Sequence, residues 1–217
     1  MLEIKDLSVS IYGKKVLNKV SLTIPKGETH VLFGPNGSGK TSLIMTLMGY
    51  PQYQITGGSI FFHGEDITQA KIEKRAQLGL GIAYQNPPVI KGLVLSKMLE
   101  IIQKKSKNLD FMVQELKMEK LIHREVNMGF SGGERKRSEL LQILAQDPSF
   151  LFLDEPESGV DIENMQIMGR VLARFLERQK VKAKEKSGLI ITHTGYILDY
   201  MNADKGYILI DGEIVCS

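Results

Sequence analysis

A glycine-rich stretch, GPNGSGKT at residues 34–41, limits the possible folds of this chain more than any other feature. The short apolar segment HVLFG leads into it, and GKTSLIMTLMGY, which has the composition of a helix, continues from it. A strand, a glycine loop and a helix in this order form the pattern of a phosphate-binding loop, or P-loop. A glycine-rich turn that matched by chance would not need these neighbours. The stretch therefore predicts an α/β core with a phosphate site.

The residue types in the loop suit a nucleoside triphosphate. Gly34 and Gly39 let backbone N–H groups turn inward around phosphates, and the helix that starts here adds its positive dipole end. Lys40 would reach the β- and γ-phosphates, and the Thr41 hydroxyl would bind Mg²⁺. We expect ATP to be held by Gly34, Pro35, Asn36, Gly37, Ser38, Gly39, Lys40, Thr41 and Ser42.

A second stretch, FLFLDEPESGVD at residues 150–161, is an apolar strand followed by two carboxylates. Asp154 would emerge at the carboxyl edge of a parallel sheet, where such folds bind ligands, and this place suits an Mg²⁺ ligand. Glu155 would point near the γ-phosphate, where a carboxylate can orient or deprotonate the attacking water. By itself such a pair is more often an ordinary polar loop. The P-loop upstream favours the catalytic interpretation.

The remaining patterns predict alternating strands and helices. LEIKDLSVSIY and VLNKVSLTI are typical of amphipathic strands, GIAYQNPP and GLIITH of buried strands, and KGYILIDGEIV of a hairpin. DIENMQIMGRVLARFLERQKVKAKEK predicts a long helix. From Ser96 to Lys120 the sequence is charged and helical in period, without a strand signal. We therefore predict one domain over residues 1–217, with a helical subdomain inserted at about residues 86–140.

Composition restricts the partners and the location. The 217 residues are 42% hydrophobic, which is enough for a core, and 28 basic against 25 acidic residues leave a net charge of +3. This balance predicts neither nucleic acid nor an anionic membrane as partner, and the lysine-rich RQKVKAKEK is interpreted as a solvated helix end. The single cysteine, Cys216, cannot alone hold an iron–sulfur cluster. Because no apolar run approaches the ~18 residues of a membrane span, we expect a cytoplasmic protein without membrane insertion.

Three further features complete an ordered set. Gln85 closes the strand GIAYQ, FSGGERKR at residues 130–137 precedes a helix, and His193 ends the strand GLIITH. P-loop, glutamine, Ser-Gly-Gly signature, Asp-Glu strand, SGVD loop and histidine occur in that order. In this set, over nearly the whole chain, the sequence resembles the nucleotide-binding ATPases of the ABC superfamily. The specificity lies in the order, since SGG or a lone histidine is more often structural than functional.

The resemblance implies a fold and a set of roles. The fold is a P-loop NTPase core with a mixed sheet, an N-terminal antiparallel β-subdomain and an inserted helical subdomain. Glu155, His193, Gln85 and Lys40 would be catalytic, and Thr41, Gln85 and Asp154 would hold Mg²⁺. A tyrosine at position 12 matches the aromatic residue that stacks on adenine in this family. A core or edge-strand tyrosine is the alternative for Tyr12.

The signature predicts a second anion site. Ser131, Gly132 and Gly133 offer a hydroxyl and backbone N–H groups at a helix start. The resemblance implies that this site faces the γ-phosphate held by another ATPase subunit, with Asp161 reaching across. Two copies of the chain would then pair around ATP and separate after hydrolysis.

Three stretches resemble the SufC family, the soluble ATPases of the Suf iron–sulfur cluster assembly machinery. They are VNMGFSGGERKRSELLQIL, DEPESGVDIENM and THTGYILDYMNADKGYILIDGEIV. This resemblance implies SufB- and SufD-like scaffold proteins as partners, received by the region from Asn86 to Lys120. Val89, Ile90 and Val94 are candidate contacts there, or else part of the subdomain core.

Two other functions remain open. The chain could be the ATPase subunit of a membrane transporter, as Pro156 after Glu155 is usual in transporters. It could also be a nucleotide-gated binding module that hardly hydrolyses ATP. The presence of Glu155, Gln85 and His193 disfavours the binding module.

Overall fold

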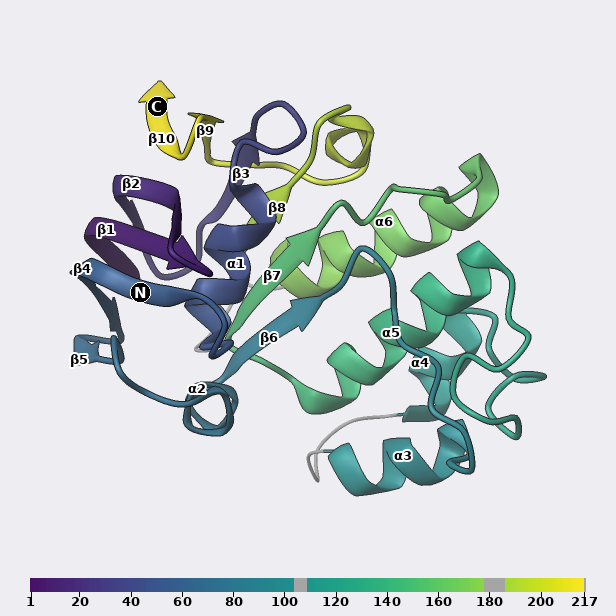
Figure 1. Cartoon of the computed structure of the whole chain (residues 1–217). Coiled ribbons are helices and arrows are strands. Elements are labelled where there is room, and N and C mark those ends of the chain that lie inside the picture. The colour runs from purple at the N-terminus through teal and green to yellow at the C-terminus, as the bar shows by residue number, and fades with distance from the viewer. Residues whose placement is uncertain (104–108, 178–185, 217) are drawn as a thin grey trace.

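A six-stranded sheet forms the centre of the protein (Figure 1). The computed structural model describes residues 1–103, 109–177 and 186–216. The strand order is β10-β9-β3-β8-β7-β6, and all pairs are parallel except β10 with β9. This is the predicted mixed sheet. Its strands are β3 (Thr29–Phe33), β6 (Leu80–Ala83), β7 (Phe150–Asp154), β8 (Ser187–Ile191), β9 (Lys205–Ile210) and β10 (Glu213–Cys216).

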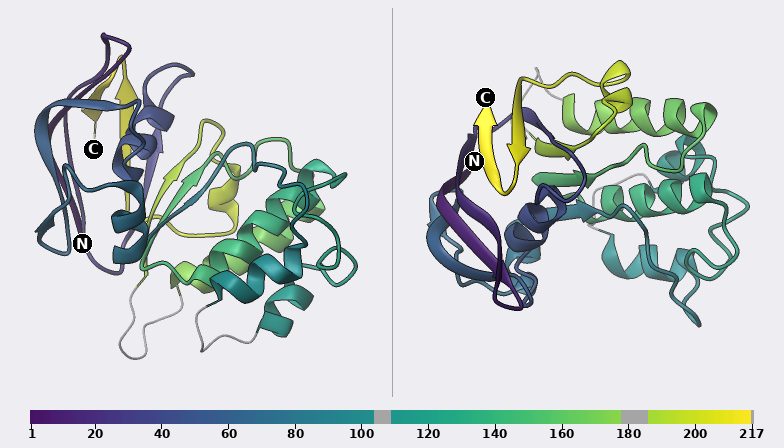
Figure 2. Two further views of the ribbon diagram at one scale, coloured as in Figure 1. Left: turned by 60° about the horizontal axis from the view of Figure 1, so that its bottom comes forward. Right: turned by 45° about the horizontal axis from the view of Figure 1, so that its top comes forward.

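A second, antiparallel sheet lies beside the first, with strand order β2-β1-β4-β5. Figure 2 shows it on the opposite side of the molecule from most of the helices. It is the antiparallel subdomain expected near the N-terminus, and its alternating burial follows from the period-2 patterns of its strands. The strands are β1 (Leu2–Ile11), β2 (Lys14–Ile24), β4 (Gln54–Phe62) and β5 (Glu65–Asp66).

The helices largely follow the predicted segments. They are α1 (Lys40–Met48), α2 (Ile72–Leu78), α3 (Leu95–Ile102), α4 (Leu109–Glu115), α5 (Gly132–Gln146), α6 (Ile162–Glu177) and the short 3₁₀ helix η1 (Tyr196–Asp199). Helix α2 was not predicted, because seven residues are too few for a helical period to be recognised. Residues 178–185 of the predicted long helix, with most of its lysine-rich end, lie outside the described residues, as do residues 104–108. Within the described ranges, no helix has both the length and the apolar character needed to cross a membrane.

Two hydrophobic cores lie on the two faces of the central sheet. On β7, Leu151 and Leu153 pack among the residues of α5 and α6, while Phe150 and Phe152 pack with α1 and the antiparallel sheet. Alternate side chains of a strand point to opposite faces, so one continuous apolar strand serves both cores.

The strand register aligns the predicted functional loops. Leu32 of β3 pairs with Ile191 of β8, which also pairs with Asp154 of β7. Ala83 of β6 pairs with Leu153. Because these parallel strands end together, the segments that follow them meet at one edge of the sheet. Asp154 ends β7, and the P-loop, Gln85, Glu155 and His193 follow the ends of these four strands.

Candidate functional site

A cavity of about 650 Å³ opens at this edge of the sheet. We call it the nucleotide cavity. Its lining includes the following predicted site residues: Asn36, Gly37, Gly39, Lys40, Thr41, Ser42, Gln85 and Glu155. These come from three loops far apart in the sequence. The fold therefore brings most of the predicted phosphate and catalytic residues to one place.

The P-loop is closely packed around its lysine. Lys40 donates through Nζ to the carbonyl oxygens of Gly34 (2.7 Å) and Pro35 (2.9 Å), and among the described residues no carboxylate lies within ion-pair distance of it. Lys40 is buried, and no carboxylate partner among the described residues competes with a polyphosphate for its ammonium group. At Gly34 a Cβ atom would lie 2.2 Å from the carbonyl oxygen of Leu209, so only glycine fits there.

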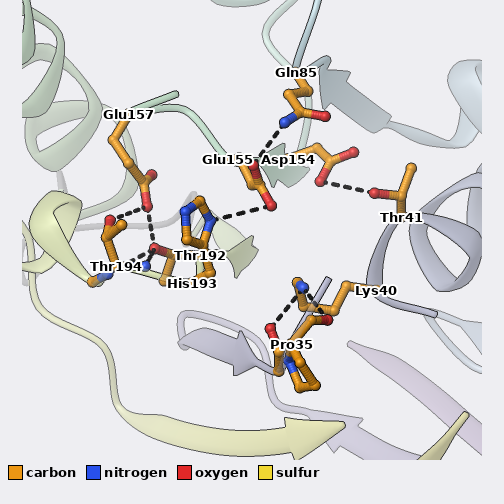
Figure 3. A network of polar contacts seen from close by, with 12 residues as sticks. Pro35, Lys40, Thr41, Gln85, Asp154, Glu155, Glu157, Thr192, His193 and Thr194 are labelled. Carbon is orange, nitrogen blue, oxygen red and sulfur yellow. Dashed lines mark hydrogen bonds and ion pairs between the residues drawn. The ribbon is translucent and has the colours of Figure 1, made fainter. Parts of the chain in front are cut away.

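Asp154 lies at the end of β7 and accepts a hydrogen bond from the Thr41 hydroxyl (Oγ1 to Oδ1, 3.3 Å; Figure 3). Burial raises the pKa of Asp154, and the hydrogen bond from Thr41 opposes that rise. A hydroxyl beside a carboxylate is a donor set that fits Mg²⁺. Among residues 1–103, 109–177 and 186–216, no group of three or more His, Cys, Asp or Glu side chains is placed to hold a metal ion. The remaining ligands of a Mg²⁺ at this place would come from phosphate and water.

Glu155 is held from two sides. Gln85 donates through Nε2 to its Oε2 (2.7 Å), and Nδ1 of His193 lies 3.3 Å from its Oε1 (Figure 3). The Glu155 backbone has a positive φ of 46°, and its N–H donates to the carbonyl of Ile191 (3.0 Å). A non-glycine residue in this conformation is uncommon and is kept only where its surroundings require it. Gln85 and His193, which follow two different strands, thus meet at the Glu155 carboxylate.

Helix α5 contributes two charged residues that the sequence did not single out. Lys136 donates to the carbonyl of Tyr84 (2.9 Å), and Glu139 accepts from the N–H of Tyr84 (2.7 Å). Both side chains are buried. Burial lowers the pKa of Lys136, although nearby carboxylates oppose this, and burial raises the pKa of Glu139 to about 7. They hold the residue that precedes Gln85. The sequence shows that Lys136 and Glu139 share a helix face, but it does not show that this face lies against the end of β6.

The signature residues begin α5. Ser131 caps the helix in a capping box with Glu134, since each side chain bonds the backbone N–H of the other. Among the described residues that line the nucleotide cavity, Ser131, Gly132 and Gly133 do not occur. The N-terminal end of α5 lies away from α1 in Figure 1. The structure therefore does not bring the signature to the P-loop of the same chain.

Asp161 lies close to the signature. It accepts from the backbone N–H (2.8 Å) and the side-chain amide (2.7 Å) of Asn164 at the start of α6. A Cβ at Gly133 would come 2.3 Å from that amide nitrogen, so the glycine permits close approach of the two helix starts. Ser131 and Asp161 are thus on one side of the molecule.

Tyr12 does not lie in the core. It forms the β1–β2 turn, with a φ of 49°, and its side chain is 94% exposed. The core and edge-strand interpretations of this tyrosine are therefore wrong. It does not line the nucleotide cavity, and its predicted contact with adenine stays a prediction.

The candidate partner contacts divide between the two interpretations. Val89 is exposed, whereas Ile90 and Val94 are half-buried and Ile90 packs against the core.

Five residues that line the nucleotide cavity were not predicted from the sequence: Lys14, Lys15, Val16, Asp211 and Gly212. The adjacent KKV after Tyr12 and the DG turn were visible signals, but nothing local linked them to the P-loop.

Comparison with known proteins gives a consistent result. Residues 17–158 match the ABC transporter family. The whole chain is 37% identical to "Probable ATP-dependent transporter SufC" of Escherichia coli, of which it covers 92%. It is 36% identical to a "Probable ABC transporter ATP-binding protein" of Streptococcus pyogenes, with 100% of this chain and 88% of that protein covered. In fold it is similar to an ATP-binding cassette solved as a dimer in a post-hydrolysis state with ADP and Pi (TM-score 0.80, 19% identity, covering 99% of this chain and 97% of that one).

Proposed function

This chain belongs to the ABC family of ATP-hydrolysing proteins, and on that premise we propose that it drives iron–sulfur cluster assembly by ATP-dependent pairing on SufB- and SufD-like scaffold proteins. The predicted resemblance to ABC ATPases, and among them to SufC, is confirmed, and so is the α/β fold. The assembly role, the partners and the residue roles below are proposals.

The observation that carries the hydrolytic roles is the position of Glu155 beside the P-loop. We propose that Lys40 and the P-loop N–H groups bind the β- and γ-phosphates, and that Asp154, Thr41 and Gln85 hold Mg²⁺, which would neutralise phosphate charge when bound. Glu155 accepts a proton from the attacking water. At the same step the water oxygen forms a bond to the γ-phosphorus, and the bond between the γ-phosphorus and the β–γ bridging oxygen breaks, which releases ADP and phosphate. Gln85 and His193 orient the carboxylate, because each touches one of its oxygens.

The position of the signature supports pairing. A P-loop without the signature beside it leaves the γ-phosphate open on one side, and a second copy can supply Ser131, Gly132 and Gly133 there. Asp161, on the same side as Ser131, would come to that interface. The similar cassette solved as a dimer with ADP and Pi supports the pairing of two copies of this fold.

The similarity to SufC over 100% of the chain favours a scaffold as the partner. The alternative is a membrane permease, which the similarity to the streptococcal ABC transporter ATP-binding protein favours. For either partner we propose the region from Asn86 to Lys120 as the receiving segment. The chain would act in the cytoplasm.

Co-purification separates the two functions. The tagged chain is isolated from its native cells, and the proteins retained with it are identified. We expect soluble scaffold proteins that carry iron when purified with the chain. Retention of a multi-span permease, with no scaffold, would contradict the assembly role. A parallel preparation of Lys40→Ala shows which of the retained proteins require bound ATP.

A further inference from the structure

A buried carboxylate two residues beyond Glu155 has no role in the steps above. Glu157 is 7% exposed and follows Pro156 in the segment after β7. Its Oε1 accepts hydrogen bonds from two hydroxyls, those of Thr192 and Thr194 (3.0 Å from Thr194 Oγ1; Figure 3). These threonines stand directly before and after His193. We call residues 192–195 the threonine turn.

The Thr192 hydroxyl connects the threonine turn to Glu157. Thr192 is fully buried, and its Oγ1 accepts from the backbone N–H of Thr194 (3.2 Å) and of Gly195 (2.8 Å). A hydroxyl has one hydrogen and two lone pairs. Donation of the hydrogen to Glu157 therefore leaves both lone pairs for the two N–H groups, and every bonding position of the hydroxyl is used.

The turn carries His193 on its outer side. The His193 side chain is 43% exposed, and its Nδ1 lies 3.3 Å from Glu155 Oε1. Glu155 is itself tied to the same strand end through its N–H and the Ile191 carbonyl. The segment 155–157 thus holds the segment 191–194 at two points, and His193 lies between them (Figure 3).

From these contacts we propose that Glu157 is a positioning residue for ATP hydrolysis, which orients His193 toward Glu155 through the hydroxyls of Thr192 and Thr194. The inference rests on the proposed role of His193. One oxygen of Glu157 accepts from both hydroxyls, so this side chain fixes the two residues that flank His193 to a single point. Among the described residues Glu157 forms hydrogen bonds with Thr192, Thr194 and Val160 and none with the P-loop, and it does not line the nucleotide cavity, so ATP affinity should not depend on it.

The test uses two matched pairs of variants of the full chain. Thr192→Val removes the hydroxyl and keeps the shape, while Thr192→Ser keeps the hydroxyl. Glu157→Leu removes the acceptor, while Glu157→Gln keeps a neutral one. Phosphate release is measured at saturating Mg-ATP and at several protein concentrations, so that weaker pairing is distinguished from slower chemistry.

We expect Thr192→Val and Glu157→Leu to lower kcat roughly tenfold to hundredfold with KM for ATP almost unchanged, because a group misplaced by about 1 Å costs a factor of this size. Thr192→Ser should retain wild-type kcat, and Glu157→Gln should fall in between. If Glu157→Leu keeps wild-type kcat, or if the serine and valine variants lose activity equally, the proposal is overturned.

A spectroscopic arm separates this inference from the proposed function. The His193 imidazole signal, assigned in a histidine-labelled chain by comparison with His193→Ala, should shift in Glu157→Leu and shift less in Glu157→Gln. An unchanged signal in Glu157→Leu would overturn the positioning role even if His193 is needed for hydrolysis. Full activity of His193→Ala would instead contradict the role of His193 in the proposed function.

Discussion

At the scale of single residues, the site depends on how one carboxylate is oriented. Glu155 is mostly buried, and its two oxygens contact Gln85 and His193. The neighbouring Asp154 bonds Thr41 instead. Two adjacent carboxylates therefore have different partners, and the proposed division between metal ligand and proton acceptor follows from these contacts.

Glu155→Gln should separate binding from hydrolysis. Mg-ATP binding should persist, because Lys40, Thr41 and Asp154 are unchanged, while hydrolysis should slow by roughly 10²- to 10⁴-fold, the usual effect of a positioned acid–base group. Nucleotide titration and phosphate release with the partner present measure the two effects. Glu119→Gln, at an exposed position that does not line the nucleotide cavity, is the control. Full turnover by Glu155→Gln would exclude Glu155 as proton acceptor.

Glu139 should make stability depend on pH. Burial raises its folded pKa to about 7 from an ordinary value of 4.5, so between these pH values the folded chain holds a proton that the unfolded chain releases. The free energy of unfolding should therefore fall as pH rises from 4.5 to 7, by about 3 kcal/mol in total, and this contribution should then stay constant. Glu139→Gln, which is never ionised, should lack this loss. Urea unfolding of both proteins at pH 5 and pH 8 measures it, and an equal change in both would contradict the prediction.

At the scale of elements, the last hairpin contacts the first functional loop. The N–H of Gly212, in the β9–β10 turn, donates to the carbonyl of Ser38 in the P-loop (2.9 Å), and the Gly212 carbonyl accepts from the N–H of Asn18 (2.8 Å). Leu209 fills the space beside Gly34. The conformation of the P-loop thus depends on a hairpin that follows it by about 170 residues of chain.

Gly212→Ala should weaken ATP binding as well as folding. The residue has a φ of 79°, and an added Cβ would lie 2.6 Å from the carbonyl oxygen of Val16 in β2, so the turn must move away from β2 and disturb its hydrogen bond to Ser38. Gly64→Ala is a matched control, because Gly64 has a φ of 83° but no atom within 4 Å of the added Cβ. Each change should cost roughly 1–2 kcal/mol of stability through backbone strain. Only Gly212→Ala should lower ATP affinity, as measured by nucleotide titration; equal affinities of the two variants would contradict the contact's role.

At the scale of the whole molecule, one chain is proposed to hold two halves of different sites. The P-loop opens into the nucleotide cavity. The signature lies at the N-terminal end of α5, beside Asp161 and away from α1. Closing a complete site then requires a second copy. Hydrolysis should therefore rise with protein concentration and with any partner that brings two copies together.

Mixing two inactive variants tests whether sites are shared. Lys40→Ala disables the P-loop, and Ser131→Arg places a bulky side chain where the other copy's γ-phosphate would approach. A mixed dimer would contain one site with both defects and one with neither, so phosphate release should recover in part at intermediate mixing ratios. If mixed dimers form and no ratio restores activity, each chain closes its own site and the shared-site proposal fails.

Local patterns in the sequence were sufficient for the elements and the motifs. Alternating apolar residues predicted β1 and β2, short continuous apolar stretches predicted β3, β6, β7 and β8, and the glycine loop between strand and helix predicted α1 and the phosphate site. The Ser131 start of α5 was also readable, because capping depends on residues three positions apart. Each of these features is determined within a few residues, where backbone geometry couples neighbours directly. Helix α2 was too short for this kind of signal.

Contacts across the sheet were decided only by the tertiary structure. Glu157 with Thr192, Glu139 with the Tyr84 backbone, and Gly212 with Ser38 each join segments that no period or motif relates. They exist because the strand order β10-β9-β3-β8-β7-β6 places the ends of distant strands side by side. The amino-acid sequence by itself determined which side chains are proposed to carry the chemistry. The sheet order decided which buried groups hold them in place, since burial and long-range pairing arise only when the two cores close around the same sheet.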